Sequence, residues 1–240
     1  TMYAFIHGMW ALDNSREGKA CGVNNELLIL RKTGCYADFT HSSWGTMNPT
    51  LTNTLYYAKD YPTSPKSYDK GEVVRVGGTE WGDLLIFEGP SIQGLRYDHG
   101  DVTMQDLPTP ARINRWVRTA IHVKGRPEWI FVKVFTHGAI ARDHEALLGK
   151  GAERMYETLE KKYNDGLRYR LHYATSREAY TILKAAEAGH SGNPNEYRDF
   201  VIPPYANQKI MASLPYQLIT YGPDKIEFVS IDEKEGHFRF

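Results

Sequence analysis

Short apolar runs alternate with helical patterns near the start of the chain. Residues 3–7 (YAFIH) are typical of a strand, and residues 24–34 predict a helix that begins at Asn24 and ends before Gly34. Residues 35–41 (CYADFTH) follow at once and predict a second strand. A strand, a helix and a strand with short connections favour a parallel pair.

The alternation continues along most of the chain. Further strands are predicted at 72–78, 83–89, 128–138 and 167–175, and further helices at 49–60, 109–123, 143–166 (broken near Gly149 and Gly151) and 176–189. The near-continuous apolar character of 128–138 fits a central parallel strand that is covered on both faces. The tail predicts a β-hairpin around Gly222-Pro223. We therefore expect an α/β domain over residues 1–205 and a C-terminal β extension over 206–240 that packs on it.

Charge and composition exclude some classes of protein. The 29 Lys and Arg residues balance 29 Asp and Glu residues, which argues against a nucleic-acid binder that acts through bulk charge. No apolar run approaches the roughly 18 residues that a membrane span needs, and no signal peptide is visible. Cys21 and Cys35 form no C-x-x-C pair, which disfavours a thiolate metal site. These features indicate a cytoplasmic protein with reduced thiols, or a periplasmic one if a leader has been removed.

Four histidines lie at or near the ends of predicted strands: His7, His41, His137 and His172. The carboxyl ends of parallel strands meet at one rim, where sites are usually built. Imidazole nitrogens bind Zn²⁺, and a carboxylate such as Asp13 can complete an open site. The alternative is that each histidine is a structural residue with a local hydrogen bond.

Two carboxylates have both a functional and a structural interpretation. Asp13 is either a ligand or base, or the first residue of an Asx-turn. Asp38, inside a predicted strand, is either a functional group or the ion-pair partner of Arg31 or Lys32. Glu26 opens a predicted helix, where its negative charge favours the helix dipole, and we interpret it as structural.

Aromatic side chains supply the candidate sugar-binding residues. Trp10, Trp44 and Trp81 lie in predicted turns, and Tyr57 lies near the extended middle loop. Such rings stack on sugar faces, although tryptophan more often covers a core.

Several stretches, among them FIHGMWALDNS, CGVNNELLILRKTGCYADFT and WIFVKVFTHGA, resemble a family of bacterial proteins found with polysaccharide biosynthesis. That family is similar to polysaccharide deacetylases, within the glycoside hydrolase/deacetylase superfamily. The resemblance implies an irregular (β/α) barrel, a divalent metal held by two histidines and an aspartate, and a second aspartate as base. It places His7 and Asp13 in the metal-binding segment and His137 at the position of the acid.

The chain departs from the pattern of these deacetylases at several positions. The usual His-x-x-x-His spacing and an Asp-Asp pair are absent, so we expect the barrel to lack its first strand, and His41 stands where relatives have another residue.

Three functions follow as hypotheses. In the first, the protein is a zinc-dependent deacetylase of a carbohydrate polymer or oligosaccharide, with His7, Asp13 and His41 as metal ligands. His137, Asp38 and His172 then serve as catalytic residues. In the second, Asp13, Asp38 and Glu88 include the paired carboxylates of a glycoside hydrolase. In the third, the protein binds glycans without catalysis.

Overall fold

The computed structural model describes residues 2–94, 97–137 and 140–204, together with the backbone of three strands between 216 and 239. The chain forms two compact units, Thr1–Val201 and Ile202–Phe240. The first unit contains a mixed sheet with helices, and all candidate site residues belong to it. The predicted division into a barrel-like catalytic domain over 1–205 and a β extension over 206–240 that packs on it remains a prediction.

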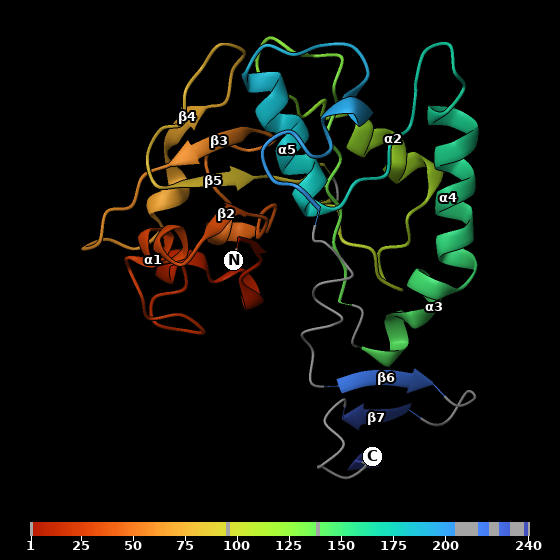
Figure 1. Cartoon of the computed structure of the whole chain (residues 1–240), viewed down its shortest axis with the longest axis horizontal. Helices are drawn as coiled ribbons and strands as arrows, with labels where there is room; N and C mark the ends of the chain where they lie inside the picture. Colours follow the sequence, from red (N-terminus) through yellow and green to blue (C-terminus); the bar gives the residue numbers. More distant parts are fainter. Residues whose placement is uncertain are drawn as a thin grey trace. The chain divides into compact units, whose positions relative to one another are not determined.

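The first unit is built on a five-stranded mixed sheet (Figure 1). Its strands are β1 (Tyr3–Phe5), β2 (Cys35–Asp38), β3 (Leu55–Ala58), β4 (Gly71–Val73) and β5 (Leu84–Phe87). Their order in the sheet is β1-β2-β5-β3-β4. The strands β1, β2 and β5 run parallel, and β3 pairs antiparallel with β5 and β4. The predicted parallel pair at the start of the chain is therefore confirmed.

The three central strands are buried along their whole length, because both faces of the sheet are covered. Helix α1 (Glu26–Lys32) contributes Leu27 and Leu30 to a core cluster with alternate residues of β2, β3 and β5. Helix α5 (Ser176–Glu187) covers the other face, where Tyr180 packs on Tyr36 with ring centroids 4.8 Å apart. This double cover fixes the ends of β1, β2 and β5, from which the candidate site residues project.

The remaining helices have clear sequence signals at their ends. Helix α2 (Pro110–Arg118) begins after Thr109, whose side chain accepts from the Arg112 amide. The predicted helix 143–166 is divided at Gly149 into α3 (His144–Leu148) and α4 (Lys150–Tyr163), as expected. Helix α5 is capped by Thr175 in a capping box with Glu178.

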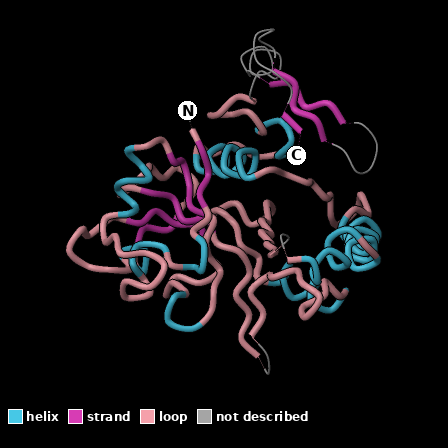
Figure 2. The backbone as a smooth tube through the Cα atoms, turned by 90° about the horizontal axis from the view of Figure 1, so that it is seen from below, coloured by secondary structure: helices cyan, strands magenta, loops and turns pink. Residues whose placement is uncertain are grey.

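The predicted (β/α) barrel is wrong, because the sheet is open. No described strand joins β4 to β1, and β3 runs against the direction that a parallel barrel requires. The predicted strands 128–138 and 167–175 are wrong, because residues 128–137 and 167–175 are loops; residue 138 lies outside the described residues. Figure 2 shows how much of the chain is loop around the magenta strands. In the first of these segments, the amides of Phe131 and Phe135 donate to the carbonyls of Ile121 and Gly100, which are separate contacts rather than a ladder.

The second unit contains three antiparallel strands, β6 (Tyr216–Thr220), β7 (Ile226–Ser230) and β8 (Phe238–Arg239). Strands β6 and β7 pair antiparallel on either side of Gly222-Pro223, as the tail predicts. None of the helices in the described part of the chain has the length and apolar character that a membrane crossing requires.

Candidate functional site

His7 lies two residues after the end of β1 and is held by hydrogen bonds from its backbone and its ring. Its backbone amide donates to the Thr40 hydroxyl at 2.8 Å, and that hydroxyl donates to Asp38 at 2.7 Å. Its ring nitrogen Nδ1 lies 2.6 Å from the carbonyl oxygen of Gly8. Because a carbonyl only accepts, Nδ1 is the donor in this bond, which leaves Nε2 as the ring nitrogen that could bind a metal. This arrangement is typical of histidines that bind metals, whose second nitrogen is fixed by a hydrogen bond.

Two further side chains lie close to His7. Cys21 belongs to the loop before α1, and Glu26 is the first residue of α1. Nε2 of His7 lies 3.4 Å from Oε1 of Glu26, and Sγ of Cys21 lies 3.6 Å from Oε2 of Glu26. The three ligand atoms all lie within 4.8 Å of one another, so the group could hold a metal ion. The side chains of His7 and Glu26 are 13% and 14% exposed, so solvent still reaches the group.

Asp13, predicted as a metal ligand, holds Glu26 in position instead. Its amide donates to Oε2 of Glu26 at 2.6 Å, and its own carboxylate accepts from the amides of Glu26 at 3.3 Å and Ser67 at 2.6 Å. Burial of Asp13 raises the pKa of its carboxyl to about 6, although the bonds to Ser67 oppose this shift. Asp13 is thus a structural link between the candidate ligands and the loop at Ser67.

The loop that carries Cys21 has an unusual backbone. Six residues without the freedom of glycine have a left-handed conformation with φ between +50° and +67°: Met9, Trp10, Asp13, Asn14, Glu17 and Ala20. Each costs of the order of 1 kcal/mol, so the loop holds this path only because side-chain bonds fix it. The bonds of Asp13 and the bond from Asn14 Nδ2 to Asn24 at 2.6 Å are among them.

The geometry fits metal binding better than nucleophilic catalysis. A cysteine nucleophile needs an imidazole nitrogen within hydrogen-bond reach of the sulfur, on a ring that a third group orients. Here the Cys21 sulfur contacts the Glu26 carboxylate at 3.6 Å, and Nε2 of His7 also faces that carboxylate, at 3.4 Å. Imidazole, thiolate and carboxylate converging on one point are a ligand set instead.

Trp10, three residues after His7, brings two further histidines to the same end of the sheet. Its ring lies 5.8 Å from that of His99, 6.0 Å from that of His137 and 6.1 Å from that of Phe135. We call these four residues the Trp10 cluster. The structure therefore brings His99 and His137, which are far apart in sequence, to one indole ring, that of Trp10.

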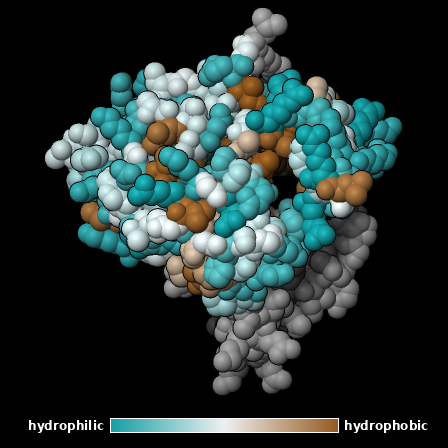
Figure 3. All heavy atoms as spheres, turned by 90° about the horizontal axis from the view of Figure 1, so that it is seen from above, coloured by the Kyte–Doolittle hydropathy of each residue, from teal (hydrophilic) through white to brown (hydrophobic). Residues whose placement is uncertain are grey.

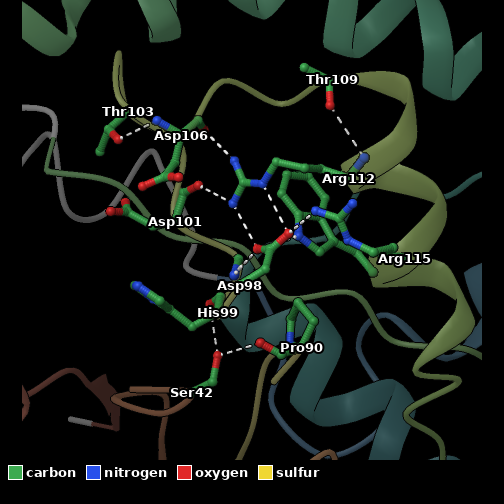
Figure 4. Close-up of polar contacts among 12 residues, drawn as sticks. Ser42, Pro90, Asp98, His99, Asp101, Thr103, Asp106, Thr109, Arg112 and Arg115 are labelled. Carbon is green, nitrogen blue, oxygen red and sulfur yellow. Dashed lines mark hydrogen bonds and ion pairs between the residues drawn. The ribbon is translucent and has the colours of Figure 1, made fainter. Parts of the chain in front are cut away.

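Two polar atoms next to the Trp10 cluster lack partners among the described residues. They are Nδ1 of His99 and Oδ1 of Asp101, and both are buried. Figure 4 shows that these two side chains point away from Asp98, which faces Arg112. Burial raises the pKa of Asp101, and the nearby charge of His137 opposes the shift. Asp101 is a candidate proton acceptor beside His137 that the sequence did not reveal.

Asp38, His41 and Glu88 lie in the interior and are fully buried. Burial raises the pKa of Asp38 to about 7 and of Glu88 to about 8, while it holds the pKa of His41 well below its usual value. His41 Nδ1 bonds to Ser43 at 3.0 Å, and Lys133 Nζ donates to the carbonyl of Phe39 at 2.7 Å. These side chains are enclosed together and do not join the candidate metal ligands.

The other predicted residues lie apart from the ligand group. His172 is in the loop before α5, where Asn195 bonds to its side chain. The Tyr57 hydroxyl is buried and donates to Glu187 at 2.8 Å. Trp44 and Trp81 are 55% and 39% exposed.

Cys21 and Glu26 were missed as ligands because their spacing matches no known motif. The only sequence signal is a cysteine five residues before the acidic first residue of a helix, in a turn-rich segment. The chain matches no family model, no curated protein and no solved structure. The candidate site therefore depends on its own geometry.

Proposed function

We propose that this protein is a zinc-dependent hydrolase that removes acetyl groups from a carbohydrate polymer or oligosaccharide. The observation that carries the proposal is the convergence of His7 Nε2, Cys21 Sγ and the Glu26 carboxylate within 4.8 Å. All three belong to the usual ligands of Zn²⁺. Three protein ligands, rather than four, are typical of catalytic sites, where water or substrate takes the remaining position.

A bound Zn²⁺ would lower the pKa of a water molecule towards neutrality and polarise the acyl carbonyl. The chain supplies the orientation. Gly8 fixes the His7 tautomer, and Asp13 fixes the Glu26 carboxylate through its amide. We assign His137 as the group that gives a proton to the leaving sugar atom; the assignment is supported by the contact of its ring with that of Trp10, three residues after His7. Asp101 lies close enough for the charge of His137 to oppose the rise that burial causes in the pKa of the Asp101 carboxyl.

The carbohydrate substrate is supported by the aromatic side chains and by the resemblance to polysaccharide deacetylases. Trp10, three residues after the candidate ligand His7, is half-buried, and a ring of this kind can stack on a sugar. The glycoside hydrolase alternative has less support, since Asp13, Asp38 and Glu88 have no exposed surface that a glycosidic bond could reach.

The test compares zinc binding and acetate release in wild type and two ligand variants, Cys21→Ala and Glu26→Gln. Cys35→Ala is the matched control, because Cys35 is buried in the core cluster and is not part of the ligand group. We expect wild type and Cys35→Ala to bind an equimolar amount of zinc. The ligand variants should bind more weakly by more than the about 10–100-fold that loss of an outer-shell partner costs.

Acetate release from acetylated oligosaccharides should require zinc and should be lost in both ligand variants. Equal zinc affinity in Cys21→Ala, Glu26→Gln and wild type would refute the metal site. Zinc binding without acetate release from any acetylated saccharide would leave the site standing and refute the deacetylase activity.

A further inference from the structure

A second feature lies at the carboxyl end of α2, where a surface hollow of about 350 Å³ opens. It is lined by Ser91, Ile92, Gln93, Arg115, Arg118 and Thr119. No carboxylate is among these described lining residues. Its volume falls within the range of small-ligand sites, about 300–1,000 Å³.

The guanidinium groups of Arg115 and Arg118 are available to bind an anion, because the described carboxylates near them do not neutralise both positive charges. Asp98 accepts two bonds from Arg112, at 2.7 and 3.0 Å, and only one from Arg115, at 3.1 Å. In Figure 4, the guanidinium groups of Arg112 and Arg115, both from α2, point toward the Asp98 carboxylate. Arg118 has no ion pair with any described residue, and both Arg115 and Arg118 are exposed.

The structural explanation for these arginines is the helix dipole, which favours cations in the last turn. It accounts for two positive charges at the end of α2 but not for a hollow between them and another segment. The carbonyls of that turn are also satisfied, since Trp116 accepts from the Thr119 amide and hydroxyl and Val117 accepts from Ala120. Few unpaired carbonyls are therefore left to repel an anion at this end.

We infer that the hollow binds an oxyanion, namely the carboxylate or phosphate group of a small ligand. Arg115 and Arg118 lie three residues apart on one face of α2, so their planar groups can each donate to one anion. Gln93, whose side chain has no hydrogen bond to a described residue, also lines the hollow and offers it a neutral donor. The inference does not depend on the proposed hydrolase, because the hollow contains none of its residues.

An apolar docking surface is a weaker candidate. The hydrophobic side chains on the face shown in Figure 3 form several separate groups among hydrophilic residues, and no single apolar face emerges there.

The experiment titrates the metal-free protein with inorganic phosphate, D-glucuronate and D-glucose while amide chemical shifts are recorded by NMR. We expect phosphate or glucuronate to shift the signals of Gln93 and Thr119, with an affinity that falls as NaCl is added. D-glucose should cause no shift. Tighter binding of phosphate identifies a phosphate ester as the ligand group, and tighter binding of glucuronate identifies an acidic sugar.

The decisive variant is Arg118→Gln, because Arg118 has no structural ion pair to lose. We expect anion affinity to fall about tenfold, the value of one charge-assisted hydrogen bond. Arg154→Gln, which changes an exposed arginine of α4 outside the hollow, should bind like wild type. Absence of shifts in wild type, unchanged affinity in Arg118→Gln, or equal shifts with D-glucose would overturn the inference.

Discussion

The ion pairs of Asp98 with Arg112 and Arg115 allow a quantitative prediction of the free energy of unfolding of the first unit. Asp98 is 6% exposed and accepts hydrogen bonds from Arg112, Arg115, the Trp116 indole nitrogen and the Gly100 amide. The Arg112 side chain is 11% exposed. Replacing Asp98 by alanine leaves a guanidinium group and an indole N–H inside without their acceptor. Breaking a buried pair in this way costs about 3–5 kcal/mol.

We expect the lower part of that range, about 3 kcal/mol, for Asp98→Ala. In this variant the Arg112 guanidinium keeps its hydrogen bonds to the carbonyls of Asp101 and Leu107, at 2.8 and 3.2 Å, so it still has acceptors. Urea unfolding measures the change through the midpoint of the transition. A double variant, Asp98→Ala with Arg112→Met, should regain part of the loss because the uncompensated charge is removed with its partner.

A loss below about 1 kcal/mol in Asp98→Ala would refute this reasoning, since that is the value of an exposed pair. The pH dependence gives an independent check. Burial alone would raise the pKa of Asp98, but the bonds from Arg112 and Trp116 outweigh it and lower the pKa. A lowered carboxyl pKa stabilises the fold above the unfolded value of about 3.9, and that stability is lost as pH falls below it. Wild type should therefore lose more stability than Asp98→Asn between about pH 4 and pH 2.

Three further predictions concern other parts of the first unit. Burial raises the pKa of Glu88 to about 8, so wild type should lose stability as pH rises from about 5 to 8, and Glu88→Gln should flatten that dependence in urea unfolding. Thr175→Ala removes the capping box of α5 and should cost about 1 kcal/mol in the same assay, whereas a Ser replacement should retain most of it. Gly82→Ala should lower the thermal midpoint, because Gly82 has φ +65° and an added Cβ would lie 2.5 Å from the Ala58 carbonyl oxygen; an unchanged midpoint would contradict this.

The parallel pair at the start of the chain was predictable because its signals are local. An apolar strand, a short amphipathic helix and the turn at Gly34 follow one another within 40 residues, and each is encoded by its own neighbours. The strand Leu55–Ala58 was hidden inside a predicted helix, since four apolar residues fit both patterns.

The segment from 129 to 137 shows where the sequence misled. Its apolar run suggested burial on both faces, yet Ile130, Val132 and Val134 are 37–40% exposed. Phe131 points inward and meets the ring of Phe87 at 5.4 Å. The run therefore has a buried and an exposed side despite its uniform apolar character, and composition alone does not distinguish these cases.

The candidate site was only partly predictable for a similar reason. His7 could be found because it ends a strand, and strand ends are recognisable from periodicity. Cys21 and Glu26 reach it through a loop whose path depends on contacts of Asp13 and Asn14 rather than on a repeating pattern. Such convergence is a tertiary property.

The left-handed loop between residues 9 and 20 divides the candidate ligands into two kinds. His7 and Glu26 are attached to a strand and a helix, whereas Cys21 depends on a strained connection for its position. Loss of the bonds of Asp13 and Asn14 would free that connection to relax, so the thiol should move away before the imidazole or the carboxylate does. Digestion by a protease would then detect the relaxed loop through cleavage within this connection, and among descendants of this sequence the candidate sulfur ligand should be the most readily exchanged.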